Sequence, residues 1–184
     1  MTHLTRRAFA LSAAALPLAA CGNGIGSDGA AIVDSRVDSA LNFLYTNYPD
    51  TRDIADRASG ILVMPLITEA GLGFGGSFGR GALRVGDTTV DYYSSTSGSA
   101  GLQIGVQQFS HVLFFMTPAA LADFRASSGW AAGANLEYAI DDKGELLRAE
   151  TITSLTPVLA VVFGQTGLRL GATLEGTKYT RIIP

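Results

Sequence analysis

A short glycine pattern recurs three times in this chain, and it constrains the fold more than any other feature. Residues 71–75, 101–105 and 167–171 each read G-L-x-Φ-G, where Φ is a large apolar residue. At the two-residue period of a strand, the large residues point to one face and the glycines to the other. Glycine on a strand face permits close approach of another backbone, a tight barrel bend or a bulge. The pattern therefore predicts a Gly-rich sheet or barrel-like core.

One glycine in each copy tests the packing interpretation: Gly73, Gly105 and Gly171. If glycine allows close backbone approach there, valine should be badly tolerated at these positions. We expect each valine to destabilise the fold by more than the ~0.5–1 kcal/mol of ordinary glycine propensity effects.

The first copy overlaps two catalytic motifs. Residues 71–76 (GLGFGG) spell the dinucleotide fingerprint G-x-G-x-x-G, and residues 75–79 (GGSFG) spell the serine-hydrolase elbow G-x-S-x-G. Both motifs need a helix directly after the glycines. Residues 77–93 instead contain three more glycines and alternate in strand fashion. We therefore reject a dinucleotide site and expect no cofactor.

A hydrolase remains the catalytic alternative, because Ser77, then Asp87 or Asp91, then His111 follow the chain order of an α/β-hydrolase triad. His111 is the one histidine after residue 20, so a histidine-dependent triad has to use it. The non-catalytic interpretation of His111 is a half-buried strand residue. One histidine without a free thiol cannot form the usual zinc sites, so no metal is expected.

The first 20 residues are predicted to be an export signal and not part of the fold. MTHLTRRAFALSAAALPLAAC combines a basic start, an apolar run too short to span a bilayer, and small residues before Cys21. Residues 18–21 match a lipobox, which predicts that Cys21 is acylated and becomes the new N-terminus. Residues 5–9 match a twin-arginine export signal. Gly22 stands where Asp would retain a lipoprotein in the inner membrane, so the outer membrane is favoured.

The rest of the chain has the length of one domain and an acidic balance. Without Arg6 and Arg7 it carries 11 basic and 16 acidic residues, a net charge of −5. This balance argues against nucleic acid as a partner. Residues 21–29 are predicted to be the lipidated Cys and a flexible tether, and residues 30–184 a single domain facing the periplasm.

Helical spacing of apolar residues predicts an amphipathic helix over 30–47 that packs on the core. A short helix is expected over 51–58, and Thr117-Pro118 predicts another over 119–125 with Thr117 as N-cap. Turns are expected at 86–87, 97–98 and 142–144. Strands are expected at 60–67, 70–78, 80–86, 88–95, 100–108, 110–116, 130–140, 145–154, 158–163 and 167–175. The predicted fold class is α+β with a mostly antiparallel sheet.

Four cations are candidates for contact with a lipid phosphate. Arg80 and Arg84 fall on one face of one predicted strand, and Lys178 and Arg181 lie near the end of the chain. They bind a phosphate together only if the fold gathers them. The alternative is that they are separate surface charges.

Four blocks of the sequence resemble one known family. They are ASGILVMPLITEAGLGFGGSFGRGAL, DYYSSTSGSAGLQIGVQQ, GWAAGANLEYA and GLRLGATLEGTKYTRI. In this order they are similar to the bacterial branch of the SYLF domain, the lipid-binding domain of yeast and animal actin-regulating proteins. The resemblance runs from about Ala30 to the C-terminus. It implies a compact α+β domain, rich in antiparallel strands, with an affinity for membrane lipid.

The eukaryotic members bind a phosphoinositide, partly through a basic amphipathic N-terminal segment. Here the helix at 30–47 offers Arg36 as its one cation, so the resemblance implies lipid association with the ligand open. We therefore expect an envelope-anchored lipoprotein with a non-catalytic domain and phospholipid as partner. The alternatives are the esterase-like hydrolase above and a structural lipoprotein that binds another envelope protein.

Overall fold

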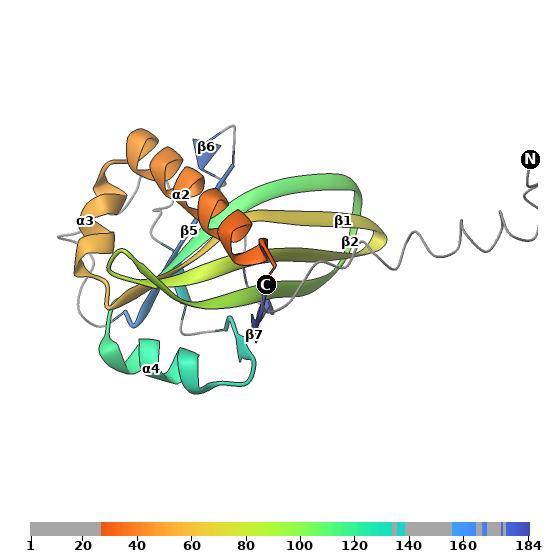
Figure 1. The fold of residues 1–184 in the computed structure, drawn as a ribbon. Helices are drawn as coiled ribbons and strands as arrows, with labels where there is room; N and C mark the ends of the chain where they lie inside the picture. Colours follow the sequence, from red (N-terminus) through yellow and green to blue (C-terminus); the bar gives the residue numbers. More distant parts are fainter. Residues whose placement is uncertain (1–26, 134–135, 139–155, 165–166, 169–173, 175) are drawn as a thin grey trace, which may run out of the picture.

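The computed structural model describes residues 27–133, 136–138, 156–164, 167–168, 174 and 176–184. Helices α2 (Gly29–Asn47) and α3 (Asp50–Arg57) lie on one face of a curled sheet, and α4 (Pro118–Ala126) lies on the other (Figure 1). The fold is α+β, as predicted.

One long antiparallel hairpin forms most of the sheet. Its strands are β1 (Gly60–Val85) and β2 (Thr88–Phe115). The predicted turn at 86–87 joins them, and Gly86 has a φ of 58°, which glycine adopts without steric cost. The turn predicted at 97–98 is wrong, because Ser97 pairs with Ser77 and β2 continues through it.

The hairpin curls back on itself where the glycine pattern occurs (Figure 1). Gly71 pairs with Gly105, so the first two copies of the pattern lie on neighbouring strands. The register then shifts between Leu72 and Phe74, where residues 101–103 lie between the partners of these two residues. Such irregularities bend a strand and increase its twist. The first two copies therefore mark a bend, one of the roles that their glycines predicted.

A close backbone approach occurs elsewhere in β1, at Gly79 and Gly81. A Cβ atom on Gly79 would lie 2.5 Å from the carbonyl oxygen of Leu66, and one on Gly81 would meet the carbonyl oxygen of Val63. Because β1 curls, its second half packs against its first half at these positions. Only glycine leaves room for this contact.

The valine predictions made for the repeated pattern stay predictions. Gly171 lies outside the described residues. For Gly73 and Gly105 the structure describes the backbone but not the space that a side chain would enter. In the hairpin, the glycines that the structure places in close backbone contact are Gly79 and Gly81.

Five shorter strands complete the described sheet. They are β3 (Trp130–Ala131), β4 (Leu136–Tyr138), β5 (Val158–Gly164), β6 (Gly167–Leu168) and β7 (Lys178–Ile182). β5 pairs with the end of β2, and β7 pairs with residues 92–96 of β2. All the pairings are antiparallel except that of β4 with β5. The sheet is therefore mostly antiparallel, as predicted.

Two strand predictions need correction. The single strand expected at 130–140 is divided, because β3 pairs with β7 whereas β4 pairs with β5. β7 was not predicted, and its weak pattern explains this, since Tyr179 is its one fully buried side chain. The strand predicted at 145–154, the turn at 142–144 and most of 167–175 lie outside the described residues.

The helices follow the sequence pattern closely. The predicted stripe of α2 is buried on the sheet through Val33, Val37, Leu41 and Leu44. α4 begins as predicted, since the side chain of Thr117 accepts a hydrogen bond of 3.1 Å from the backbone N–H of Ala120. α2 therefore packs on its own core, as expected.

The centre of the sheet is covered on both faces, which explains why residues 111–115 of β2 are all buried. One apolar cluster joins α2 and α3 to the sheet, and it includes Leu41, Ile54 and Val112. The other joins α4 to the opposite face, and it includes Phe124 and Leu113. The domain is thus three layers, with a helical layer on each side of the sheet.

Candidate lipid site

The four cations predicted for a lipid phosphate do not gather in one place. Arg84 reaches α2, where its Nη2 lies 2.7 Å from Asp38 Oδ1. Only 14% of the Arg84 side chain is exposed. This ion pair ties β1 to α2 and neutralises the charge of Arg84. Arg80 lies on β1, before Arg84 in the chain, and lines a hollow beside α2.

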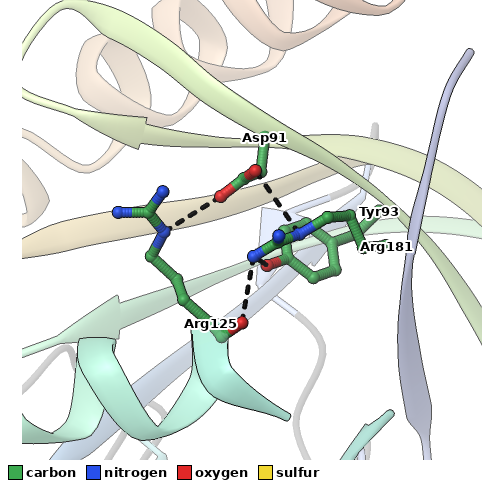
Figure 2. A network of polar contacts seen from close by, with 4 residues as sticks. All are labelled: Asp91, Tyr93, Arg125 and Arg181. Atoms are coloured by element: carbon green, nitrogen blue, oxygen red, sulfur yellow. Dashed lines mark hydrogen bonds and ion pairs between the residues drawn. The ribbon is translucent and has the colours of Figure 1, made fainter. Parts of the chain in front are cut away.

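Arg181 belongs to a polar network on the α4 side of the sheet (Figure 2). Its Nε lies 3.4 Å from Asp91 Oδ1, while Arg125 Nε lies 2.9 Å from Asp91 Oδ2. Arg181 also donates a hydrogen bond of 2.9 Å to the backbone carbonyl of Arg125. A longer hydrogen bond, of 3.5 Å, from Arg181 Nη2 to the Tyr93 hydroxyl raises the pKa of Arg181 above its ordinary value. The network joins β7 to β2 and α4, so it supports the fold rather than an open anion site.

Lys178 stands apart from the other three cations. It is exposed on β7, pairs with Thr96 on one side and with Ala131 on the other, and its Cε lies against Gly129. The fold therefore separates the predicted set into Arg80 and Arg84 near α2, Arg181 near α4, and Lys178 at the start of β7.

The residues of the hydrolase alternative are also kept apart. The Ser77 and Ser97 hydroxyls share a hydrogen bond of 2.7 Å across β1 and β2. His111 Nε2 and the Tyr179 hydroxyl lie 2.8 Å apart in the buried core. Asp91 is held by the two arginines of Figure 2. Ser77, Asp91 and His111 therefore each make their polar contacts with residues outside the predicted triad.

His111 is a buried core histidine, not the half-buried strand residue that the sequence predicted. Its exposed fraction is 1%, and Nδ1 has no hydrogen-bond partner among the described residues. Burial lowers the pKa of His111 to about 3, so the ring is neutral at ordinary pH. Where the chain is described, no group of three or more potential metal ligands occurs.

A groove runs along one flank of α2, and its first hollow has a volume of about 660 Å³. It lies between the first turns of α2 and the middle of β1. Three exposed apolar side chains line it: Ile32, Leu66 and Phe78, with exposed fractions of 50%, 38% and 51%. The guanidinium-bearing residues Arg36 and Arg80 line the same hollow. The groove therefore combines an apolar surface with positive charge.

A second hollow of about 370 Å³ continues the groove toward the middle of α2. It shares Arg36, Pro65 and Leu66 with the first hollow. Its other walls include Phe43 and Phe163, whose rings stack with their centroids 6.0 Å apart. Arg36 thus stands where the two hollows join.

The acidic side chains of α2 contact the sheet at other points. Asp34 accepts hydrogen bonds from the Tyr92 hydroxyl at 2.8 Å and from the Thr89 hydroxyl at 2.9 Å. Burial, together with the hydrogen bond to Asp34, raises the pKa of Tyr92 to about 12. Asp38 is paired with Arg84. These contacts hold α2 on the sheet and leave Arg36 as the cation that α2 presents to the groove.

Comparison with known proteins gives one family match. Residues 96–181 match the family model described as Ysc84: Las17-binding protein actin regulator, which is the SYLF domain. This part of the chain belongs to the SYLF family. The SYLF domain is a lipid-binding domain related to actin regulators. A search of curated proteins gave no match to the chain.

The SYLF match covers α4, most of β2 and nearly all of β7, and it therefore includes His111. Most of the groove is built from residues that precede the match, on α2 and β1. Sequence reasoning did not identify Ile32, Leu66 and Phe78 as site residues. Single apolar residues in an amphipathic helix or a strand are ordinary, and their grouping depends on the curl of β1.

Proposed function

We propose that this chain is an envelope-anchored lipoprotein whose SYLF-type domain binds membrane lipid without catalysing a reaction. The family match supports lipid binding in general. The observation that carries the proposal is the groove, in which exposed apolar side chains stand beside Arg36 and Arg80. A lipid offers both an apolar chain and an anionic group, so it is the ligand class that uses both parts of this surface.

The anchor in this proposal is an acyl group on Cys21, supported by the lipobox at residues 18–21. Among the described residues, no helix has the length and hydrophobicity needed to cross a membrane. Each buried CH₂ group of an anchor adds ~0.8 kcal/mol of membrane affinity. Gly22 supports outer-membrane residence, facing the periplasm. The domain then contacts lipid for a purpose other than attachment.

Replacing Cys21 with serine tests the anchor. We expect the unaltered protein in the membrane fraction of cells. The Cys21→Ser protein should lose that association, because it lacks the acylated residue. Fractionation followed by immunoblotting measures this, and Gly22→Asp serves as the matched variant that should keep lipidation but shift the protein to the inner membrane. Equal membrane association of the Cys21→Ser protein would contradict a lipid anchor at this residue.

Liposome co-sedimentation tests lipid binding by the domain itself. The sample is residues 21–184 with Cys21→Ser, so that no acyl group contributes. We expect binding to liposomes that contain anionic phospholipid and weaker binding to zwitterionic liposomes. Binding to the anionic liposomes should become several-fold weaker as salt rises from 50 to 300 mM, because salt screens exposed charges.

Either of two other outcomes changes the proposal. Salt-insensitive binding to both kinds of liposome would assign the affinity to apolar contact alone. Failure to bind any liposome would contradict lipid binding and favour the alternative of a structural lipoprotein that binds another envelope protein.

A further inference from the structure

The groove beside α2 has the length and volume of a site for one lipid chain. Its two hollows, of about 660 and 370 Å³, lie end to end and share three lining residues. Sites for small ligands usually measure roughly 300–1,000 Å³. On α2 the lining extends from Gly29 to Phe43, which at 1.5 Å per residue is about 21 Å. One leaflet of a bilayer's hydrocarbon core is about 15 Å thick, so an acyl chain fits along this length.

The apolar walls of the groove are exposed to water in the structure. Ile32 and Phe78 are each about half exposed and stand on opposite sides of the first hollow, on α2 and β1. A single exposed apolar side chain is ordinary in a folded domain, whereas several of them around one depression are typical of a binding site. Here three of them, with Leu66, gather around one depression. Covering them with a hydrocarbon chain removes apolar surface from water, which is favourable.

The charges around the groove favour an anion at its middle. Arg36 is exposed, borders both hollows and has no ion-pair partner among the described residues. Arg80 adds a second guanidinium group in the first hollow. Asp28 is the acidic side chain in the lining, and it lies eight residues before Arg36, about 12 Å along the helix. Guanidinium groups match the geometry of phosphate oxygens.

The start of the described chain lies at the mouth of the groove. Ser27 lines the first hollow and donates a hydrogen bond of 3.0 Å to the carbonyl oxygen of Pro184. Five residues, 22–26, therefore separate Cys21 from Ser27, and the six Cα–Cα steps between them can span at most about 22 Å. If Cys21 is anchored in a membrane, the groove lies within reach of the lipids around it.

We infer that the groove binds a single anionic phospholipid from the membrane in which the protein is anchored. One acyl chain lies against Ile32, Leu66 and Phe78, and the phosphate lies between the guanidinium groups of Arg36 and Arg80. This inference rests on the proposed lipid-binding function and assigns that function to one site.

Dodecyl phosphate carries both an alkyl chain and a phosphate group. Comparing it with ligands that carry only one of these groups tests each contact separately, and it is used below its critical micelle concentration. Isothermal titration uses residues 21–184 with Cys21→Ser, with inorganic phosphate and neutral dodecyl maltoside as comparison ligands. Dodecyl phosphate should bind at least tenfold more tightly than either. Arg36→Gln and Phe78→Ser should each weaken its binding by about tenfold, since each removes one of the two contacts.

The matched controls are Lys178→Gln and Val106→Ser. Lys178 is an exposed cation and Val106 an exposed apolar residue, and neither lines the groove. Both controls should bind dodecyl phosphate within about twofold of the unsubstituted protein. Unchanged thermal unfolding shows that each variant is folded, as expected at exposed positions.

The outcomes that overturn the inference differ from those that overturn lipid binding. If the unsubstituted protein binds anionic liposomes but Arg36→Gln and Phe78→Ser bind dodecyl phosphate normally, lipid binding stands and the groove is not its site. Equal binding of inorganic phosphate and dodecyl phosphate would overturn the acyl-chain contact. Equal binding of dodecyl maltoside would overturn the phosphate contact. No binding to liposomes or dodecyl phosphate would overturn both proposals.

Discussion

Valine in place of Gly81 is expected to destabilise the domain by about 3 kcal/mol, because it forces a side chain into a backbone contact. The added Cβ would meet the carbonyl oxygen of Val63 and would lie 2.5 Å from the sulfur of Met64. Val63 and Met64 are fully buried, so neither can move aside into solvent. The first half of β1 has to shift away from the second half, and the curl of the hairpin opens.

Gly98 is the matched control for this substitution. It also lies within the hairpin, but nothing is within 4 Å of the position that a Cβ would take. Gly98→Val should therefore change stability by only about 0.5 kcal/mol, with strand propensity favouring valine. Urea unfolding of residues 21–184 measures both variants. Equal free energies of unfolding for the two variants would show that the contact between the halves of β1 is not tight.

Acidification from pH 7 to pH 5 is expected to remove about 2 kcal/mol of stability through His111 alone. Burial lowers the pKa of His111 from 6.5 to about 3 in the folded protein. Between these values the unfolded chain binds a proton that the folded protein does not. The contribution of His111 is therefore complete above pH 6.5 and declines as the pH falls toward 3, by at most about 1.4 kcal/mol per pH unit.

His111→Gln provides the comparison, because glutamine keeps hydrogen-bonding groups near Tyr179 but does not titrate. His111 is the one histidine after residue 20, and most carboxyl groups titrate below pH 5. The free energy of unfolding of the unsubstituted protein should fall between pH 6.5 and 5, while that of His111→Gln stays nearly level, whatever its stability at pH 7. Parallel pH profiles would mean that His111 is not held neutral in the core.

Features that depend on a few neighbouring residues could be predicted from the sequence. The stripe of Val33, Val37, Leu41 and Leu44 follows from helical spacing, and all four are buried. The turn at Gly86 and the cap at Thr117 depend on backbone conformation and one side-chain hydrogen bond, and both are confirmed. In these places the local pattern and the tertiary structure require the same conformation.

The site could be predicted only in part. Arg80 and Arg84 both lie on β1, but Arg84 forms an ion pair with Asp38 and Arg181 forms one with Asp91. Which acid a cation meets depends on which elements pack together, and the sequence spacing of charges carries little information about that. The strand β7 was missed for a similar reason, since its pairing partner in β2 lies more than 80 residues earlier.

The sequence by itself determined that this chain forms a Gly-rich α+β domain with an amphipathic helix, because apolar periodicity and turn residues act over short distances. It also contained the resemblance to the SYLF family that the match of residues 96–181 confirms. Only the tertiary structure decided where glycine is essential and where Ile32, Leu66 and Phe78 meet Arg36 and Arg80. The physical reason is the curl of the hairpin, which joins residues that no local period relates.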